Sequence, residues 1–360
     1  FIMLRQADFL SNSSMGFKKD NQLVVSLQGA DAIRARAALL NELEQHNSVL
    51  SAVEITRALG RGLNISILPV ENNNGVTENV TMNAFSVGDG FLETMEMELL
   101  TGNTFRVEQT DNEINPILVN ETFVKQMEWD QPLGKRIGRS EVIGVVADFH
   151  SLSLHEAIDP AIISLYNDGY LDGLPEITRN RTSIDLIISV TGENMADTRS
   201  YIEQTIRRFS IQSVVDIRTL DDIWQEMYED DTQAINLLGL FSGVSILISL
   251  LGLAGLAAYS TQQRGKEVAI RKVLGASVLN VLTLLSLNMF TTIAFSVIPA
   301  AVATFYLSNV WLERFAYRAE FSAVPYLSAI VIIGLVSAIV LVIQTLRTAQ
   351  ANPVLMLKYE

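Results

Sequence analysis

The chain has 360 residues, of which 49% are hydrophobic and only 18% are charged, and this composition argues against an ordinary soluble protein. Its formal net charge of −14 is unevenly placed, because residues 233–360 carry 8 cations and 4 anions, a balance of +4, which leaves −18 for residues 1–232. The acidic half offers no basic face for nucleic acid, and the lack of cysteine excludes disulfides and cysteine-based metal or redox sites.

The chain opens with FIMLRQADFLSNSSMGFKKD, in which four apolar residues are followed by a polar stretch. This pattern is typical of the exit end of a membrane-spanning helix. We therefore expect residues 1–19 to be the end of a truncated first transmembrane segment and a linker. A cleaved signal peptide is the alternative interpretation, although the sequence shows neither a basic leading region nor a cleavage site.

Two strand–helix–strand patterns indicate an α+β domain over residues 20–232. The stretch NQLVVSLQG is followed by the helical ADAIRARAALLNELEQH and then by VLSAVEITRA. Later, SIDLIISV is followed by ENMADTRSYIEQTIRRF and then by SVVDIRTL. In both helical segments the apolar residues recur on one face. Two such units around one sheet predict a ferredoxin-like split βαβ lobe.

The sequence between these two units predicts an inserted small α+β lobe over about 99–167, in which Asn120 is the candidate N-cap of a short helix. The following stretch, NDGYLDGLPEITRNRT, is interpreted as a mobile loop. After the second unit, LDDIWQEMYEDDTQAINLL contains no helix breaker. We therefore expect one helix to run from the α+β domain into the first membrane span.

Residues 233–360 are predicted to form an all-α, three-span transmembrane domain. No charged residue occurs in 232–263, 273–312 or 321–346, and each run exceeds the roughly 20 apolar residues that cross a bilayer. The spans are placed at about 235–259, 281–306 and 325–346. Buried helices of a large soluble protein are the alternative, but such runs rarely recur three times in succession.

Cations near the span ends set the expected orientation. The loop between the first two spans carries Arg264, Lys266, Arg271 and Lys272, whereas the loop between the second and third spans has equal numbers of cations and anions. The positive-inside rule then places the basic loop and the C-terminus in the cytoplasm. Residues 20–232 would lie outside it, in the periplasm of a bacterium, with the chain crossing the inner membrane several times.

Catalytic and cofactor-binding motifs are missing from the sequence. The two Gly-Lys pairs are followed by Arg136 and Glu267, not by the Ser or Thr of a phosphate-binding P-loop, so we expect no ATPase activity in this chain. The stretch DFHSLSLHE contains two histidines, but their five-residue spacing suits neither one helix face nor one strand face. We interpret these histidines as structural or surface residues and predict no catalytic, cofactor or metal site.

The basic loop has a further pattern. On a helix over about 264–277, its cations and its apolar residues would form a cationic face and an apolar face, suited to the membrane surface. Simple anchoring by positive charge is the alternative, but anchoring alone does not require apolar residues at these positions. The apolar residues are Val268, Ile270, Val273 and Leu274.

The stretch QQRGKEVAIRKVLGAS resembles the cytoplasmic signature of the FtsX/MacB-like permease family of ABC transporters, and ANPVLMLKYE resembles the C-terminal ending of that family. LVNETFVKQMEWDQPLGKRI and VIGVVADFHSLSLHEAIDP resemble its periplasmic domain. The family has four spans, with the large domain between the first and the second. Three spans and a stub suggest a chain without its first spanning helix, or the second half of a paired-repeat permease.

The resemblance implies that a separate cytoplasmic ATP-binding subunit docks at the coupling helix, about 264–277, and that two permease halves or copies pair in the membrane. ATP would be bound by the partner, and its hydrolysis would move the periplasmic domain without a substrate channel through the membrane. Gly275 would allow the turn into the next span. The residues implied in coupling are Arg264, Lys266, Glu267, Arg271, Lys272, Leu274 and Gly275.

Several functions remain open at this point. An export or efflux permease would also need a periplasmic adaptor and an outer-membrane channel. A signalling relay would instead activate a periplasmic cell-wall hydrolase, and a lipoprotein-extracting permease would hand its substrate to a carrier. A membrane-tethered enzyme would need a catalytic group that the sequence does not reveal.

Overall fold

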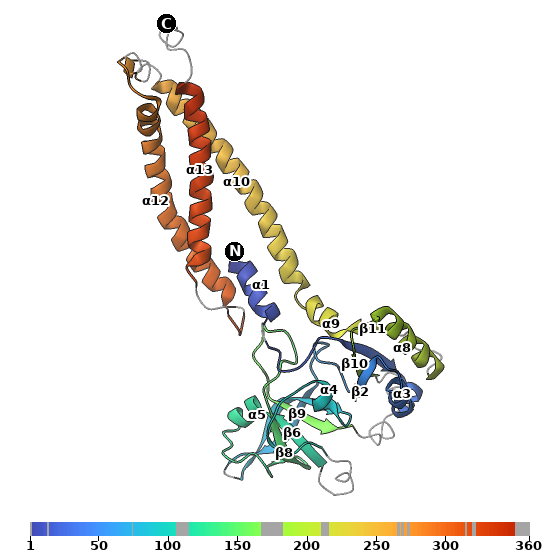
Figure 1. Cartoon of the computed structure of the whole chain (residues 1–360). Helices are drawn as coiled ribbons and strands as arrows, with labels where there is room; N and C mark the ends of the chain where they lie inside the picture. Colours follow the sequence, from blue (N-terminus) through green and yellow to red (C-terminus); the bar gives the residue numbers. More distant parts are fainter. Residues whose placement is uncertain are drawn as a thin grey trace. The chain divides into compact units, whose positions relative to one another are not determined.

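The computed structural model describes residues 2–12, 14–73, 75–105, 115–166, 183–209, 216–264, 267, 270–271, 274–313, 315–318 and 322–349. The chain divides into two compact units (Figure 1). The α/β unit comprises Asn12–Glu229, and the helical unit comprises Phe1–Ser11 with Asp230–Glu360. The sequence predicted an α+β domain over 20–232, and the α/β unit begins eight residues earlier and ends three residues earlier.

The first lobe of the α/β unit is a four-stranded antiparallel sheet with strand order β11-β1-β10-β2. Its strands are β1 (Gln22–Gln28), β2 (Val49–Ile55), β10 (Ser183–Val190) and β11 (Ile217–Thr219). Helices α2 (Ala30–Arg34), α3 (Arg36–Leu43) and α8 (Met195–Phe209) share one apolar core with the sheet. This strand order is that of the split βαβ fold, so the ferredoxin-like prediction is confirmed.

The first predicted helix of this lobe is in fact two helices, since α2 ends before Ala35 and α3 begins after it. The break coincides with a buried arginine. The Arg36 guanidinium donates to the Ile33 carbonyl at 3.1 Å and pairs with Glu54 at 3.3 Å. A buried charge must be paired, and periodicity alone does not reveal where its partners lie.

The second lobe is a closed ring of strands, because β4-β3-β7-β8-β6-β9 returns to β4 through a parallel β4–β9 pairing. Its core includes Val70, Val80 and Met82, which precede the predicted bounds of about 99–167, so the lobe also takes in β3 and β4. The elements are β3 (Ile65–Glu71), β4 (Thr77–Val87), α4 (Phe91–Thr94), β5 (Leu99–Gly102), β6 (Asn115–Asn120), α5 (Glu121–Gln126), β7 (Arg136–Ile137), β8 (Ser140–Val146) and β9 (Ala161–Leu165). The loop predicted after β9 lies outside the described residues.

The single helix predicted to leave the α/β unit is interrupted. Helix α9 (Leu220–Glu226) is capped at its start by Thr219 and Asp222, and α10 (Glu229–Gln263) begins after a turn at Met227 and Tyr228. The Tyr228 hydroxyl accepts a hydrogen bond from the Leu154 amide at 2.9 Å. The helix therefore breaks at a tertiary contact, although the sequence has no helix-breaking residue at this point.

The helical unit contains α1 (Ile2–Asn12), α10, α12 (Val278–Leu312) and α13 (Val324–Ala349). Helices α12 and α13 run side by side (Figure 1). Among the described residues, Glu229–Ser260 and Thr291–Leu312 are long and apolar enough to cross a membrane, and the apolar stretch Val324–Val340 is shorter. All three predicted spans are thus helical, while the three-span arrangement stays a prediction.

A polar contact joins α1 to the segment that follows α12. The Gln6 side chain is only 1% exposed, and its Nε2 donates to the Tyr317 carbonyl at 2.8 Å. Residues 315–318 therefore lie at α1, at the end of α12 opposite the basic segment.

Candidate functional site

The basic segment connects α10 to α12. Helix α10 ends at Gln263, Arg264 lies in a turn, and Glu267, Ile270 and Arg271 are helical. With Leu274, these last three stand at positions i, i+3, i+4 and i+7, so they share one stripe of the helix. Val268 and Val273 lie outside the described residues, so the expected division into a cationic face and an apolar face stays a prediction.

The stripe is exposed along its whole length. Arg271 and Glu267 form an ion pair at 2.8 Å, with side chains that are 47% and 45% exposed, so the pair contributes little stability by itself. Ile270 is 55% exposed and Leu274 is 80% exposed. An ion pair between two exposed apolar side chains is chemically suited to contact a partner protein, because burial would strengthen both parts of it.

The segment ends in a sharply defined turn. Gly275 has a φ of +89°, and the Ala276 amide donates to the Arg271 carbonyl at 2.9 Å, which is the six-to-one bond of a Schellman C-cap. Ser277 then caps α12, since its side chain accepts from the Asn280 amide. The sequence Leu-Gly-Ala-Ser thus ends one helix and starts the next.

Of the seven residues that the sequence implies in coupling, Lys266 and Lys272 lie outside the described residues. Glu267, Arg271 and Leu274 share the exposed stripe, and Gly275 forms the turn that follows it. Their contact with a partner subunit stays a prediction.

Sequence reasoning did not identify a second feature, a linker junction made of residues 15–19, 148–155 and 220–228 of the α/β unit. Residues 15–19 follow α1 in the chain, and residues 220–228 precede α10. Both linkers are held by the α/β unit. They are therefore the two points where the domain is connected, through the chain, to the helices of the other unit.

The first linker lies directly on residues 148–150. The His150 amide donates to the Met15 carbonyl at 2.9 Å. Gly16 has a φ of +82°, and a Cβ built on it would lie 2.4 Å from the Asp148 carbonyl oxygen and 2.8 Å from the Phe149 Cα. Only glycine fits this close backbone approach.

The two linkers also contact each other. Lys19 forms an ion pair with Asp221 at 2.9 Å, and the rings of Phe17 and Trp224 are 5.7 Å apart with an interplanar angle of 54°. Trp224 is 2% exposed, so its indole ring is buried at this contact. The sequence shows an aromatic residue in each linker, Phe17 and Trp224, but it does not show that the two rings contact each other.

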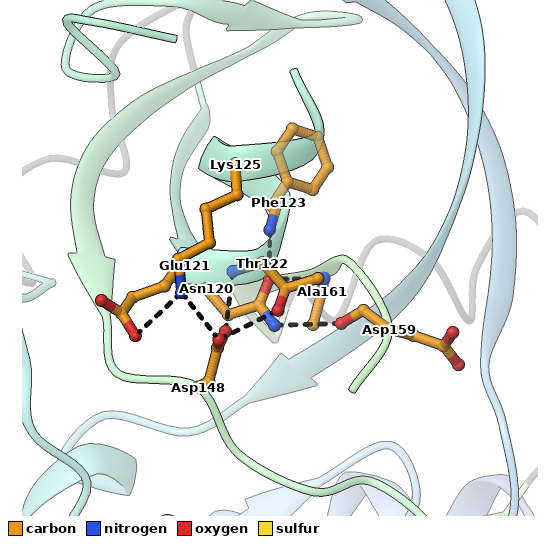
Figure 2. A network of polar contacts seen from close by, with 8 residues as sticks. All are labelled: Asn120, Glu121, Thr122, Phe123, Lys125, Asp148, Asp159 and Ala161. Carbon is orange, nitrogen blue, oxygen red and sulfur yellow. Dashed lines mark hydrogen bonds and ion pairs between the residues drawn. The ribbon is translucent and has the colours of Figure 1, made fainter. Parts of the chain in front are cut away.

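A polar network fixes the 148–150 segment beneath the first linker (Figure 2). The Asp148 carboxylate accepts from the Thr122 amide at 2.7 Å and from the Thr122 hydroxyl at 2.9 Å, and it pairs with Lys125 at 3.4 Å. The negative charge of Asp148 raises the pKa of Lys125 above its ordinary value. Asp148 therefore ties the start of α5 to the linker junction.

Asn120 secures the other end of this network (Figure 2). Its side-chain oxygen accepts from the Phe123 amide at 3.1 Å, which confirms the predicted N-cap, and from the Ala161 amide at 2.9 Å. Its Nδ2 donates to the Asp159 carbonyl at 2.9 Å. One buried amide thus joins α5 to β9.

The histidine-rich stretch is used structurally. His150 is 6% exposed, and burial lowers its pKa from the ordinary value while the Asp148 charge partly opposes the shift. The His155 ring lies 5.8 Å from the ring of Tyr228. Within the described residues, no three acidic or histidine side chains are placed to hold a metal ion.

Comparison with known proteins gives one family match. Residues 239–353 match the family model described as FtsX-like permease C-terminal. No curated protein sequence matches the chain.

Two of the solved structures with similarity to the chain are extracytoplasmic domains. The periplasmic region of MacB from Actinobacillus actinomycetemcomitans is 17% identical, with a TM-score of 0.42, covering 59% of this chain and 95% of that one. The extracellular domain of the noncanonic ABC-type transporter YknZ from Gram-positive bacteria is 12% identical, with a TM-score of 0.35, covering 52% of this chain and 93% of that one.

Proposed function

From the premise that residues 239–353 form an FtsX-like permease domain, we propose that the chain is the membrane subunit of an ABC transporter that exports its substrate by mechanotransmission. A separate cytoplasmic ATP-binding subunit supplies the hydrolysis. The chain converts the movement of that subunit into movement of its own α/β domain. A second permease half or copy completes the transporter.

The observation that carries this proposal is the continuity of α10. This helix begins one residue after Tyr228 of the linker junction and runs for 35 residues to the basic segment. A helix of that length is about 50 Å long, against about 30 Å for the hydrocarbon core of a bilayer. It can therefore connect a cytoplasmic docking site to an external domain without interruption.

Helix α12 also connects the basic segment to the opposite end of the helical unit. It starts at the turn that ends the basic segment and also runs for 35 residues. Beyond its far end, Tyr317 accepts the hydrogen bond from Gln6 of α1, whose chain continues into the first linker. Within the helical unit, Gln6 and Tyr317 therefore lie at the end of α12 opposite the basic segment.

The distribution of charged residues supports the proposed membrane orientation and a transport mechanism that conducts no ion through the spans. The positive-inside rule places the basic segment and the C-terminus in the cytoplasm of a bacterial inner-membrane protein, and residues 20–232 in the periplasm. The predicted spans contain no ionisable Asp, Glu, Lys, Arg or His for a proton or ion relay. The lack of such residues agrees with coupling by movement of whole helices, which the family resemblance implies.

The docking role is tested with the double variant Glu267→Ala and Arg271→Ala, in the transporter reconstituted with its co-purified ATP-binding subunit. We expect the stimulation of ATPase activity by the permease to fall about tenfold or more, as for the loss of a central interface pair. The control is Glu203→Ala and Arg207→Ala, which removes an i,i+4 ion pair of 2.7 Å from α8 of the α/β unit. Equal stimulation in both double variants, with normal membrane insertion, would refute docking at this segment.

A further inference from the structure

An acidic side chain is buried in the middle of the ferredoxin-like sheet. Asp185 lies in β10, whose other residues from Ile184 to Val190 are buried and mostly aliphatic, and it is only 4% exposed. A buried carboxylate is costly unless it is paired and hydrogen-bonded. The residues that pair with Asp185 therefore indicate the role of this buried carboxylate.

Those partners lie at the two ends of one short loop, residues 58–61. Asp185 Oδ2 accepts from the Ala58 amide at 2.7 Å, and Oδ1 pairs with the Arg61 guanidinium at 3.2 Å. The Ser26 hydroxyl of β1 bonds to both Asp185 and Arg61. The carboxylate thus fixes the loop at its first and its last residue.

The middle of this loop touches both the second lobe and the second linker. The Gly60 amide donates to the Ser151 carbonyl at 2.9 Å. Gly60 has a φ of +88°, and a Cβ built on it would lie 2.9 Å from Trp224 Nε1 and 3.2 Å from Ile223 Cγ2. The bare Cα of Gly60 therefore forms part of the surface on which α9 rests.

Trp224 depends on that surface for its position. Its indole Nε1 is buried and has no hydrogen-bond partner among the described residues. The ring is therefore placed by shape, between Gly60 on the loop and Phe17 on the first linker. A ring held only by packing moves when its packing surface moves.

We propose that Asp185 is a positioning residue for the linker junction: by fixing both ends of loop 58–61, it holds Gly60 against Trp224 and keeps α9 seated. The consequence for transport rests on the proposed function, since α9 leads into α10. The seating of α9 itself depends only on the contacts of the α/β unit.

The seating is measured in the full chain in detergent, in a Trp129→Phe and Trp311→Phe background that leaves Trp224 as the only tryptophan. We compare acrylamide quenching of Trp224 fluorescence in Asp185→Asn and in Arg61→Met, which releases one end of the loop. Both variants should raise the quenching constant about twofold or more, as local opening exposes the ring. If Asp185→Asn does not fold, the Arg61→Met variant alone decides the outcome.

The control is Ile206→Val, a buried core change on α8 of the same lobe, which lowers stability without touching loop 58–61. It should lower the thermal midpoint and leave the quenching constant unchanged. Quenching in Asp185→Asn and Arg61→Met equal to that of Ile206→Val would overturn the positioning role. No ATP-binding subunit is present in this assay, so its outcome is independent of the ATPase test of the proposed function.

Discussion

Replacing Gly16 by alanine should release the first linker from the α/β unit. Alanine at a φ of +82° costs about 1–2 kcal/mol for the backbone conformation alone. The new Cβ would also lie 2.4 Å from the Asp148 carbonyl oxygen, about 1 Å inside ordinary contact, and that oxygen belongs to the backbone. A shift of about 1 Å would lengthen the 2.9 Å bond between the His150 amide and the Met15 carbonyl beyond hydrogen-bonding distance.

Loss of that bond adds about 1–3 kcal/mol, because it leaves a buried polar group without a partner. The matched control is Gly134→Ala, which has a φ of +83° and no atom within 4 Å of the added Cβ, so it carries the backbone cost only. Thermal unfolding of the full chain in detergent should therefore place Gly16→Ala about 2–12 °C below Gly134→Ala. Equal midpoints would show that the linker is not held on residues 148–149.

Two further predictions concern the same junction. Because burial lowers the pKa of His150, the imidazole binds a proton more tightly in the unfolded chain than in the folded one. The free energy of unfolding should therefore fall as the pH drops below about 6.5, by at most about 1.4 kcal/mol per pH unit. The substitution His150→Gln should remove this part of the pH dependence. A wild-type pH profile that the substitution leaves unchanged would contradict it. Tyr228→Phe should leave the Leu154 amide without its hydrogen-bond acceptor, at a cost of about 1–3 kcal/mol, and should speed hydrogen exchange at that amide. The control is Tyr201→Phe, which removes only a bond to the Glu42 carbonyl and should leave exchange at Leu154 unchanged. Equal exchange rates at Leu154 in the two variants would refute the contact.

The elements of the α/β unit that were predictable are those with local signals. The strand β10 follows from SIDLIISV, and the cap of α5 follows from an asparagine placed just before a helical pattern. The strand order β11-β1-β10-β2 follows from two such units joined by one topology rule. The strand and the cap need only the residues of the element itself, and the strand order needs only the topology rule in addition.

The features that were not predictable depend on residues far apart in the chain. Closure of the second lobe needs the parallel pairing of Asn83–Val87 with Ala161–Leu165, and no local pattern specifies that register. The contact of Phe17 with Trp224 joins the two ends of the α/β unit. One signal was available and unused, since an aspartate within an aliphatic strand, Asp185, indicates a buried polar partner.

If the proposed function holds, the turn between α9 and α10 bears on how movement would pass from α10 to the α/β domain. A continuous helix would transmit a push through its own stiffness, and the contacts around it would matter little. The helix is instead interrupted at Met227 and Tyr228, and side-chain contacts hold this turn on the α/β unit. Under the proposed function, the bond from Leu154 to Tyr228 and the packing of Trp224 would then transmit movement in place of helix stiffness. It follows that substitutions at the linker junction should affect coupling more than substitutions of similar stability cost elsewhere in the domain.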